Sequence, residues 1–259
     1  MFENMSENAT ILVDNAGPVA RLTLNRPDKR NPIGPATCGE LVQALAAIKT
    51  NANVRVVVLT GAGTVFSAGG DLSAMQKPAD GPSASLVDLF SAMHELGKPI
   101  IAMVNGHALA GGLGLMVACD LVIAADTAQF GTTEIAVGLW PMMITAEITR
   151  SVGRKKTLDM MLTGRKLDAA EALASGLVNR VVPGSELETE TMKLAHELAG
   201  RSPAAMALGL HAFYRSQDME FEPQLRYLQA ELGRVLSLAD AAEGIAAFLG
   251  KRKPVWTGR

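Results

Sequence analysis

The sequence has few cysteines and no surplus of charge. Its 259 residues include two cysteines, Cys38 and Cys119, which are too few and too far apart for the spacing of a zinc site. There are 24 basic and 26 acidic residues, so no basic surface for nucleic acid is indicated. We therefore predict two reduced thiols, no metal site and no nucleic-acid partner.

Long hydrophobic runs and a leader segment are also missing. No segment approaches the roughly 20 apolar residues that a membrane-spanning helix needs. Residues 1–9 are polar and carry two glutamates, so they lack the basic and apolar regions of a secretory signal. These absences predict a cytoplasmic protein with no membrane span.

Apolar residues make up 48% of the chain and fall into alternating strand and helix patterns, enough for a sizeable core. Helical stripes are predicted to begin at Pro35 and near Leu86. Short strands, the first two forming a hairpin, are predicted at residues 10–13, 19–24, 54–60, 99–104 and 121–124. This alternation favours an α/β fold, although periodicity alone does not separate a Rossmann sheet from other α/β arrangements.

From Ser185 onward the pattern is helical. Ser185 and Glu188 fit a capping box at the start of one helix, and Ser202 begins another before Pro203. The helices of this region carry much apolar surface, which predicts association between subunits. We divide the chain into a core, residues 1–195, and a C-terminal helical oligomerisation region, residues 196–259.

Two glycine-rich segments carry the strongest functional signal. Residues 65–72 (VFSAGGDL) follow one predicted buried strand, and residues 104–112 (VNGHALAGG) follow the next. Small residues let a ligand approach the backbone closely. Two such turns, brought together, could direct two backbone N–H groups at one oxygen and so form an oxyanion hole. A dinucleotide-binding loop at Gly61 and Gly63 is disfavoured because Phe66 stands where its third glycine should be.

These segments resemble the enoyl-CoA hydratase/isomerase (crotonase) family. The likeness continues, in the family's order, at residues 22–27 (LTLNRP), 162–178 and 243–254. It implies a spiral of repeated ββα units with a C-terminal helical region that builds trimers or dimers of trimers. It also implies an acyl-CoA thioester as substrate, with coenzyme A as part of that substrate and no other cofactor.

The resemblance further implies three catalytic groups. The backbone amides of Ala68 and Gly111 would hold the thioester oxygen, and Glu134 would act as acid/base. Family hydratases usually have another glutamate where this chain has Gly114, so one of two carboxylates is kept. The apolar residues 140–143 would desolvate Glu134 and raise its pKa, which suits proton exchange near neutrality.

Coenzyme A is placed by the same resemblance against the turn at residues 26–30 and the loop at residues 68–71. Phe248 and Lys251, in the C-terminal tail of the same or of a neighbouring subunit, would also approach the coenzyme A. Among all of these, Lys29, Arg30 and Lys251 are chemically suited to phosphate. The implied substrate-binding residues are Arg26, Lys29, Arg30, Ala68, Gly69, Gly70, Asp71, Phe248 and Lys251.

The predicted reaction is proton chemistry through a thioester enolate in acyl-CoA metabolism. The sequence favours hydration or dehydration of an enoyl-CoA and isomerisation of its double bond equally. A non-catalytic acyl-CoA-binding protein is the main alternative, because Gly114 removes one carboxylate. Acyl-CoA hydrolysis on the same scaffold is a third possibility, for which the sequence offers no dedicated nucleophile.

Overall fold

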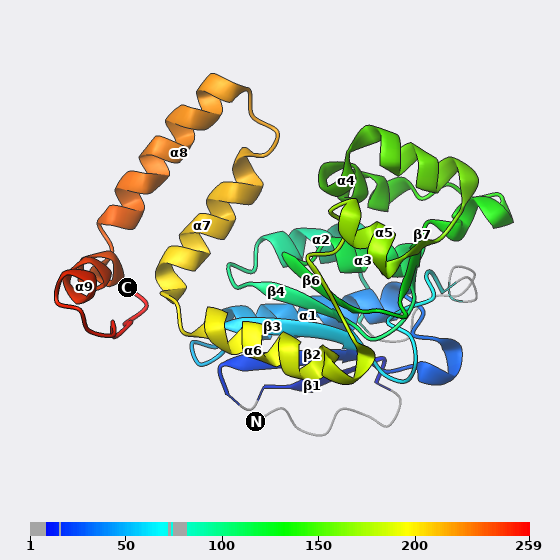
Figure 1. The fold of residues 1–259 in the computed structure, drawn as a ribbon, viewed down its shortest axis with the longest axis horizontal. Coiled ribbons are helices and arrows are strands. Elements are labelled where there is room, and N and C mark those ends of the chain that lie inside the picture. Colours follow the sequence, from blue (N-terminus) through cyan, green and yellow to red (C-terminus); the bar gives the residue numbers. More distant parts are fainter. Residues whose placement is uncertain (1–8, 16, 72–73, 75–81) are drawn as a thin grey trace.

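The computed structural model describes residues 9–15, 17–71, 74 and 82–259, and the N-terminal residues 1–8 used in the argument about a leader lie outside them (Figure 1). One sheet has six strands in the order β1-β2-β3-β4-β6-β9, and a second has three in the order β5-β7-β8. The strands are β1 Ile11–Asp14, β2 Val19–Leu24, β3 Val56–Gly61, β4 Ile100–Val104, β5 Ala108–Leu109, β6 Leu121–Ala125, β7 Gln129–Gly131, β8 Leu167–Asp168 and β9 Arg180–Val182.

The large sheet begins with the predicted antiparallel hairpin, in which Ile11 of β1 pairs with Leu24 of β2. Every later pair of neighbours in this sheet is parallel. Strands β3 and β4 are buried along their whole length. Such uniform burial is typical of parallel strands that are covered on both faces, and it explains their unbroken apolar sequences.

Helices cover the two faces of this sheet. Side chains of β3 alternate between two cores: Val57 packs with residues of α1 and α2, whereas Val56 packs with Leu187 of α6. The helices of this part are α1 Pro35–Thr50, α2 Leu86–His94, α3 Gly111–Val117, α4 Met142–Thr163, α5 Ala169–Ala174 and α6 Leu187–Ala199. Short 3₁₀ turns that lie wholly within the described ranges include η1 Pro27–Lys29, η3 Thr133–Val137 and η4 Gly184–Glu186. The predicted α/β fold is thereby confirmed.

One local prediction about helix starts is wrong. Ser185 lies inside η4, and α6 begins at Leu187 with no side chain capping it. A capping box occurs instead at α2, where Ser85 Oγ accepts from the Asp88 N–H and Asp88 Oδ2 accepts from the Ser85 N–H at 2.8 Å. Both positions have the right residue types, so tertiary context decided between them.

Three helices follow α6 and extend away from the sheets: α7 Pro203–Ser216, α8 Phe221–Leu236 and α9 Ala239–Leu249 (Figure 1). The division predicted after residue 195 falls inside α6, where Leu194 and Ala195 pack against the sheet. The helical extension therefore starts at α7. None of the helices in the described ranges is long and apolar enough to cross a membrane.

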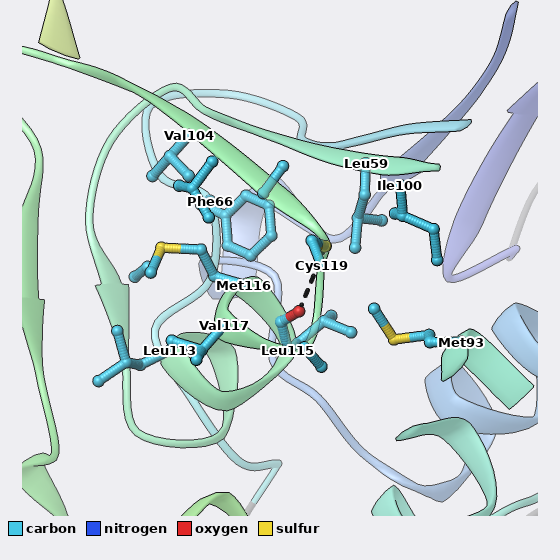
Figure 2. Close-up of a cluster of buried hydrophobic side chains, with 14 of the residues drawn as sticks. Leu59, Phe66, Met93, Ile100, Val104, Leu113, Leu115, Met116, Val117 and Cys119 are labelled. Atoms are coloured by element: carbon cyan, nitrogen blue, oxygen red, sulfur yellow. Dashed lines mark hydrogen bonds between the residues drawn. The ribbon is translucent and has the colours of Figure 1, made fainter. Parts of the chain in front are cut away.

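The two glycine-rich segments are anchored in one core (Figure 2). Phe66, at the start of the first segment, is fully buried in the same cluster as Leu113, Leu115 and Met116 of α3, which follows the second segment. Interiors are close-packed and resist displacement. The shared core therefore holds the two segments at a set distance from each other.

Candidate active site

The two glycine-rich segments meet as two corners, which we define as the first corner, residues 66–71, and the second corner, residues 105–112. Ser67 bridges to Ala108 in a parallel pairing, and the Leu109 N–H donates to the Ser67 carbonyl at 3.0 Å. Gly69 has a φ of +114°, and a Cβ there would lie 2.7 Å from the Cβ of Ala110. Only glycine allows the corners to approach this closely.

Two backbone amides without a backbone acceptor lie close together where the corners meet. Gly111 is the first residue of α3, so its N–H has no acceptor within that helix. The nitrogen of Gly70 lies 3.7 Å from the position of a Cβ on Gly111. Ile33 pairs with the residues on either side of Gly70, accepting from the Asp71 N–H and donating to the Gly69 carbonyl. The Gly70 N–H has no backbone acceptor in the described part of the chain.

The amide of Ala68 does not belong to this pair. Its N–H donates to the carbonyl of Arg30 at 2.9 Å, which ties the first corner to the turn after β2. An N–H group engaged in a backbone hydrogen bond is not available to a substrate oxygen. The amide expected at Ala68 is therefore not free, whereas that of Gly70, expected only as a binding residue, lies free beside Gly111.

Polar side chains brace the first corner. Arg26 Nη1 lies 2.6 Å from Asp71 Oδ2, and Asp71 Oδ1 accepts from the Ala74 N–H at 3.1 Å. Asn31 donates to the Val65 carbonyl at 3.0 Å, and Ser67 Oγ donates to the Asn31 carbonyl at 2.7 Å. Arg26 and Asp71, expected to bind coenzyme A, thus hold the corner in place.

The other expected binding residues fall into two groups. Lys29 and Arg30 are exposed on the turn that carries η1, adjacent to the first corner. Phe248 of α9 and Lys251 just after it are also exposed, but α9 lies at the far end of the molecule's long axis (Figure 1). The single chain therefore brings the basic turn to the corners and leaves these tail residues away from them.

A cavity of about 420 Å³ opens beside the two free amides. Glu134, on η3, is the only charged residue among its described lining residues. The Oε2 atom of Glu134 is buried and has no hydrogen-bond partner among the described residues. The lining consists of Ile33, Ala68, Gly70, Leu86, Ala110, Gly111, Thr133, Glu134, Val137, Leu139, Trp140, Pro141, Met142, Met143 and Ile144.

The environment of Glu134 has a clear electrostatic consequence. Burial raises the pKa of its carboxyl group above the ordinary value of 4.5, and the hydrogen bond from its own backbone N–H opposes this only partly. The direction expected from the apolar run after the site is thereby confirmed. A desolvated carboxylate is a stronger base than one in water.

Gly114 lies one turn after Gly111 on α3, and its surroundings are filled. A Cβ at Gly114 would overlap Cγ2 of Ile144, a buried residue in the first turn of α4, and would lie 3.5 Å from Phe90 Cζ. The missing side chain at this position has therefore not left an open space. Sequence reasoning missed Ile144, since no local pattern relates it to Gly114.

The arrangement suits one kind of chemistry. Two free amides can stabilise negative charge on a carbonyl oxygen, and a desolvated carboxylate in the same cavity can exchange a proton with a nearby carbon. No group of three or more His, Cys, Asp or Glu side chains that could hold a metal ion occurs among the described residues.

Comparisons with known proteins agree with this geometry. A model of the enoyl-CoA hydratase/isomerase family matches residues 14–259. A Thermus thermophilus protein whose name assigns it to the enoyl-CoA hydratases is 38% identical, covering 92% of this chain and 97% of its own. The 2,3-dehydroadipyl-CoA hydratase of Escherichia coli is 35% identical over 96% of this chain and 99% of its own. The crystal structure of a Mycobacterium smegmatis enoyl-CoA hydratase matches with a TM-score of 0.89 and 34% identity, covering 95% and 98% of the two chains.

Proposed function

This chain belongs to the enoyl-CoA hydratase/isomerase family of enzymes, and from that premise we propose how its site works. The N–H groups of Gly70 and Gly111 hold the thioester oxygen of an enoyl-CoA, and Glu134 moves the proton. One observation carries the proposal: the cavity that receives the two free amides also receives one desolvated carboxylate.

The two amides lower the barrier to enolate formation. Charge that develops on the thioester oxygen is met by donors already in place, and losing one such donor costs about 2.7–4 kcal/mol in well-studied enzymes. Gly111 opens α3, so the partial positive charge at the helix N-terminus adds to this stabilisation. Glu134 then needs only to accept or return a proton at carbon, which its raised pKa favours.

Two rival functions use the same fold. A binder without catalysis would not need a buried carboxylate oxygen that lacks a partner, so Glu134 favours an enzyme. Thioester hydrolysis through a covalent intermediate is supported less, because the described lining has no serine or cysteine and no histidine or second carboxylate that could activate Thr133 or act beside Glu134. Proton transfer through an enolate, in hydration or in isomerisation, is the reaction class supported best.

Replacing Glu134 by glutamine tests this assignment, since glutamine keeps the shape and removes the proton carrier. We expect kcat on enoyl-CoA substrates to fall by about 10²-fold or more, with little change in the Kd for the acyl-CoA. In the wild type, the rate of steps that use the carboxylate as base should rise with pH through a pKa above 4.5 and then level off, because the raised pKa keeps Glu134 protonated at lower pH. Stopped assays with 2-enoyl-CoA and 3-enoyl-CoA thioesters measure the loss of kcat in the variant and the pH dependence of the rate in the wild type.

Unchanged turnover in Glu134→Gln would remove Glu134 from the mechanism. Tight binding with no turnover by the wild type, at any acyl chain length, would favour the binder. The proposal requires no cofactor beyond the coenzyme A that the substrate carries. Lys29 and Arg30, exposed on the turn next to the first corner, are the proposed phosphate partners.

We further propose that the chain self-associates as a trimer or a dimer of trimers. Helix α8 has no buried residue and leaves an apolar face exposed, including Leu225, Leu232 and Leu236. Exposed apolar faces of this kind are typical of subunit interfaces. Association would also give Phe248 and Lys251 a way to reach a neighbour's site. Light scattering that returned the mass of one chain would contradict this.

A cytoplasmic location remains our prediction. Cys38 and Cys119 are both free and buried. Burial raises the pKa of the Cys38 thiol to about 11, so this thiol stays protonated at neutral pH. Two inert thiols agree with a reducing compartment.

A further inference from the structure

We propose that Ile144 decides which of the two reactions this site catalyses. Its side chain fills the space where a second carboxylate or an attacking water would have to lie, so the site moves a double bond and does not add water. The inference rests on the proposed function and narrows it to isomerisation of an enoyl-CoA.

The position of Ile144 is set by two helices. Gly114 lies three residues after Gly111 on α3, and residues at this spacing share a helix face. A side chain at Gly114 would therefore point toward the cavity, but its Cβ would overlap Cγ2 of Ile144, with Phe90 closing the other side. Ile144 is 2% exposed and itself lines the cavity. The space that a side chain at Gly114 would enter is thus taken by hydrocarbon.

The polar groups of the cavity gather on one wall. Among its described lining residues, the side chains with nitrogen or oxygen are Thr133, Glu134 and Trp140, which are neighbours in sequence. Ile144, Leu86 and other apolar residues form the rest of the described lining. An ordered water needs two to four polar partners. Away from the wall that holds Glu134, the described side chains of the cavity offer no such partner, and the N–H groups of Gly70 and Gly111 are taken by the thioester oxygen once substrate is bound.

Isomerisation needs no water and only one carboxylate. Glu134, as carboxylate, takes a proton from C2 of a 3-enoyl-CoA, and the electron pair of the broken C–H bond enters a dienolate held by Gly70 and Gly111. The protonated Glu134 then returns the proton to C4. The double bond ends between C2 and C3, Glu134 ends as a carboxylate, and no atom is gained or lost. The same carboxylate serves both carbons.

A purely structural role for Ile144 makes a different prediction. Ile144 could serve only to pack α4 against α3, as Ile148 does one turn later on α4. Ile148 is fully buried in the core and is absent from the described lining of the cavity. Truncating either residue removes the same atoms from the same helix, so Ile148→Ala is a matched control for Ile144→Ala.

The experiment measures two rates on each protein: conversion of a 3-enoyl-CoA to the 2-enoyl-CoA, and hydration of the 2-enoyl-CoA to the 3-hydroxyacyl-CoA. We expect the wild type to isomerise faster than it hydrates. Ile144→Ala should raise the ratio of hydration to isomerisation about tenfold, with a smaller rise in Ile144→Val, which keeps the Cγ2 methyl group. Ile148→Ala should leave the ratio as it is in the wild type.

A wild type that hydrates at least as fast as it isomerises would overturn the inference while leaving the proposed function intact. An equal ratio in Ile144→Ala and Ile148→Ala would overturn it as well. If the wild type performs neither reaction, the proposed function itself fails. Failure of the isomerase inference and failure of the proposed function therefore give different results.

A label in the wild-type enzyme tests the inference without any variant. A 3-enoyl-CoA that carries deuterium at C2 should deliver part of that deuterium to C4 of the product, because a cavity without water delays exchange of the proton on Glu134. Mass spectrometry of the product measures the retained label. A product that carries no deuterium at C4 would contradict the exclusion of water, because the abstracted deuteron would then have exchanged completely with solvent.

Discussion

The two corners that supply the amides are held by different means. The first corner depends on polar side chains: Arg26 pairs with Asp71, and Asn31 donates to the carbonyl of Val65. The second corner has a side-chain brace only at its start, where Asn105 Nδ2 donates to the carbonyls of Gly61 and Gly63 at 2.9 Å, and none reaches residues 106–112 in the described part of the chain. It leads directly into α3, and the turn passes through Ala110, with φ 48° and ψ −128°.

This difference shows how one function can draw on two kinds of support. A side-chain brace can be weakened gradually by removing single polar groups. A corner formed by a helix start and an unusual backbone depends instead on volume and on allowed dihedral angles. The first corner should therefore be sensitive to changes of polarity, and the second to changes of size. Three substitutions test this contrast.

Gly69→Ala should have the largest effect on activity, because Gly69 lies where the two corners are in contact. The new methyl group would lie 2.7 Å from the Cβ of Ala110, at a φ of +114° that alanine rarely adopts. Forcing the corners apart separates the two donors, so we expect kcat/KM to fall by about 10²- to 10³-fold. Steady-state kinetics on the enoyl-CoA substrate measures the loss.

Gly17→Ala is the control for strain alone. Gly17 has a φ of +132° and nothing within 4 Å of a new Cβ, and it lies in the turn between β1 and β2. It should lose stability without a comparable loss of activity. Similar kinetics in the two variants would show that contact between the corners is unimportant.

Asp71→Asn should have an intermediate effect confined to the first corner. The pair with Arg26 is largely shielded, since the Asp71 side chain is 8% exposed, so its loss should cost about 1–3 kcal/mol of unfolding free energy. The Gly70 amide next to it should become less well placed, with kcat falling about tenfold. Denaturant unfolding and kinetics measure the two effects.

Asp28→Asn provides the comparison for that change. Asp28 is exposed on η1, close to Arg26 in sequence. Asp28→Asn removes the same charge as Asp71→Asn, but it does not break a shielded ion pair such as that of Asp71 with Arg26. If both variants lost stability and activity equally, the side-chain brace would have no special role.

Ala110→Gly should have the smallest effect, and its sign is opposite. Glycine adopts the φ of 48° without strain, so unfolding free energy should rise by about 1 kcal/mol. Activity should stay near that of the wild type. In the Gly69→Ala background, removing the methyl group of Ala110 should restore part of the activity, because it removes the contact between the two side chains.

Thermal and denaturant unfolding of the single variant, and kinetics of the double variant, measure these outcomes. A loss of stability in Ala110→Gly would show that the second corner is not strained. An additive loss in the double variant would mean that Gly69 and Ala110 do not act through their contact.

Much of the fold could be predicted from local patterns. The strands at β3 and β4 were visible as apolar runs, and α1 from Pro35 and its apolar stripe. The capping box shows the limit of such reasoning. Ser185 and Ser85 both had suitable partners three residues on, yet only Ser85 caps a helix. Ser185 lies in the 3₁₀ turn η4, which precedes α6 along the chain. No local rule distinguishes Ser185 from Ser85.

The site was predictable to a similar degree. The motifs pointed to two loops that meet in the structure and to Glu134, which lines the same cavity, and the apolar run after it predicted the direction of its pKa shift. They did not show which amide of the first corner is free. Ala68 and Gly70 are equally plausible from the letters alone, and the choice depends on where the carbonyl of Arg30 lies.

The sequence by itself determined the elements, the two glycine corners and the family, because each is recorded in residues that are close together along the chain. Only the tertiary structure decided that the Gly70 amide lies free beside Gly111 while that of Ala68 is engaged, and that Ile144 fills the space beside Gly114. Both facts concern atoms brought into contact by packing between distant segments. Such contacts depend on the register of whole strands and helices, which no short stretch of sequence specifies.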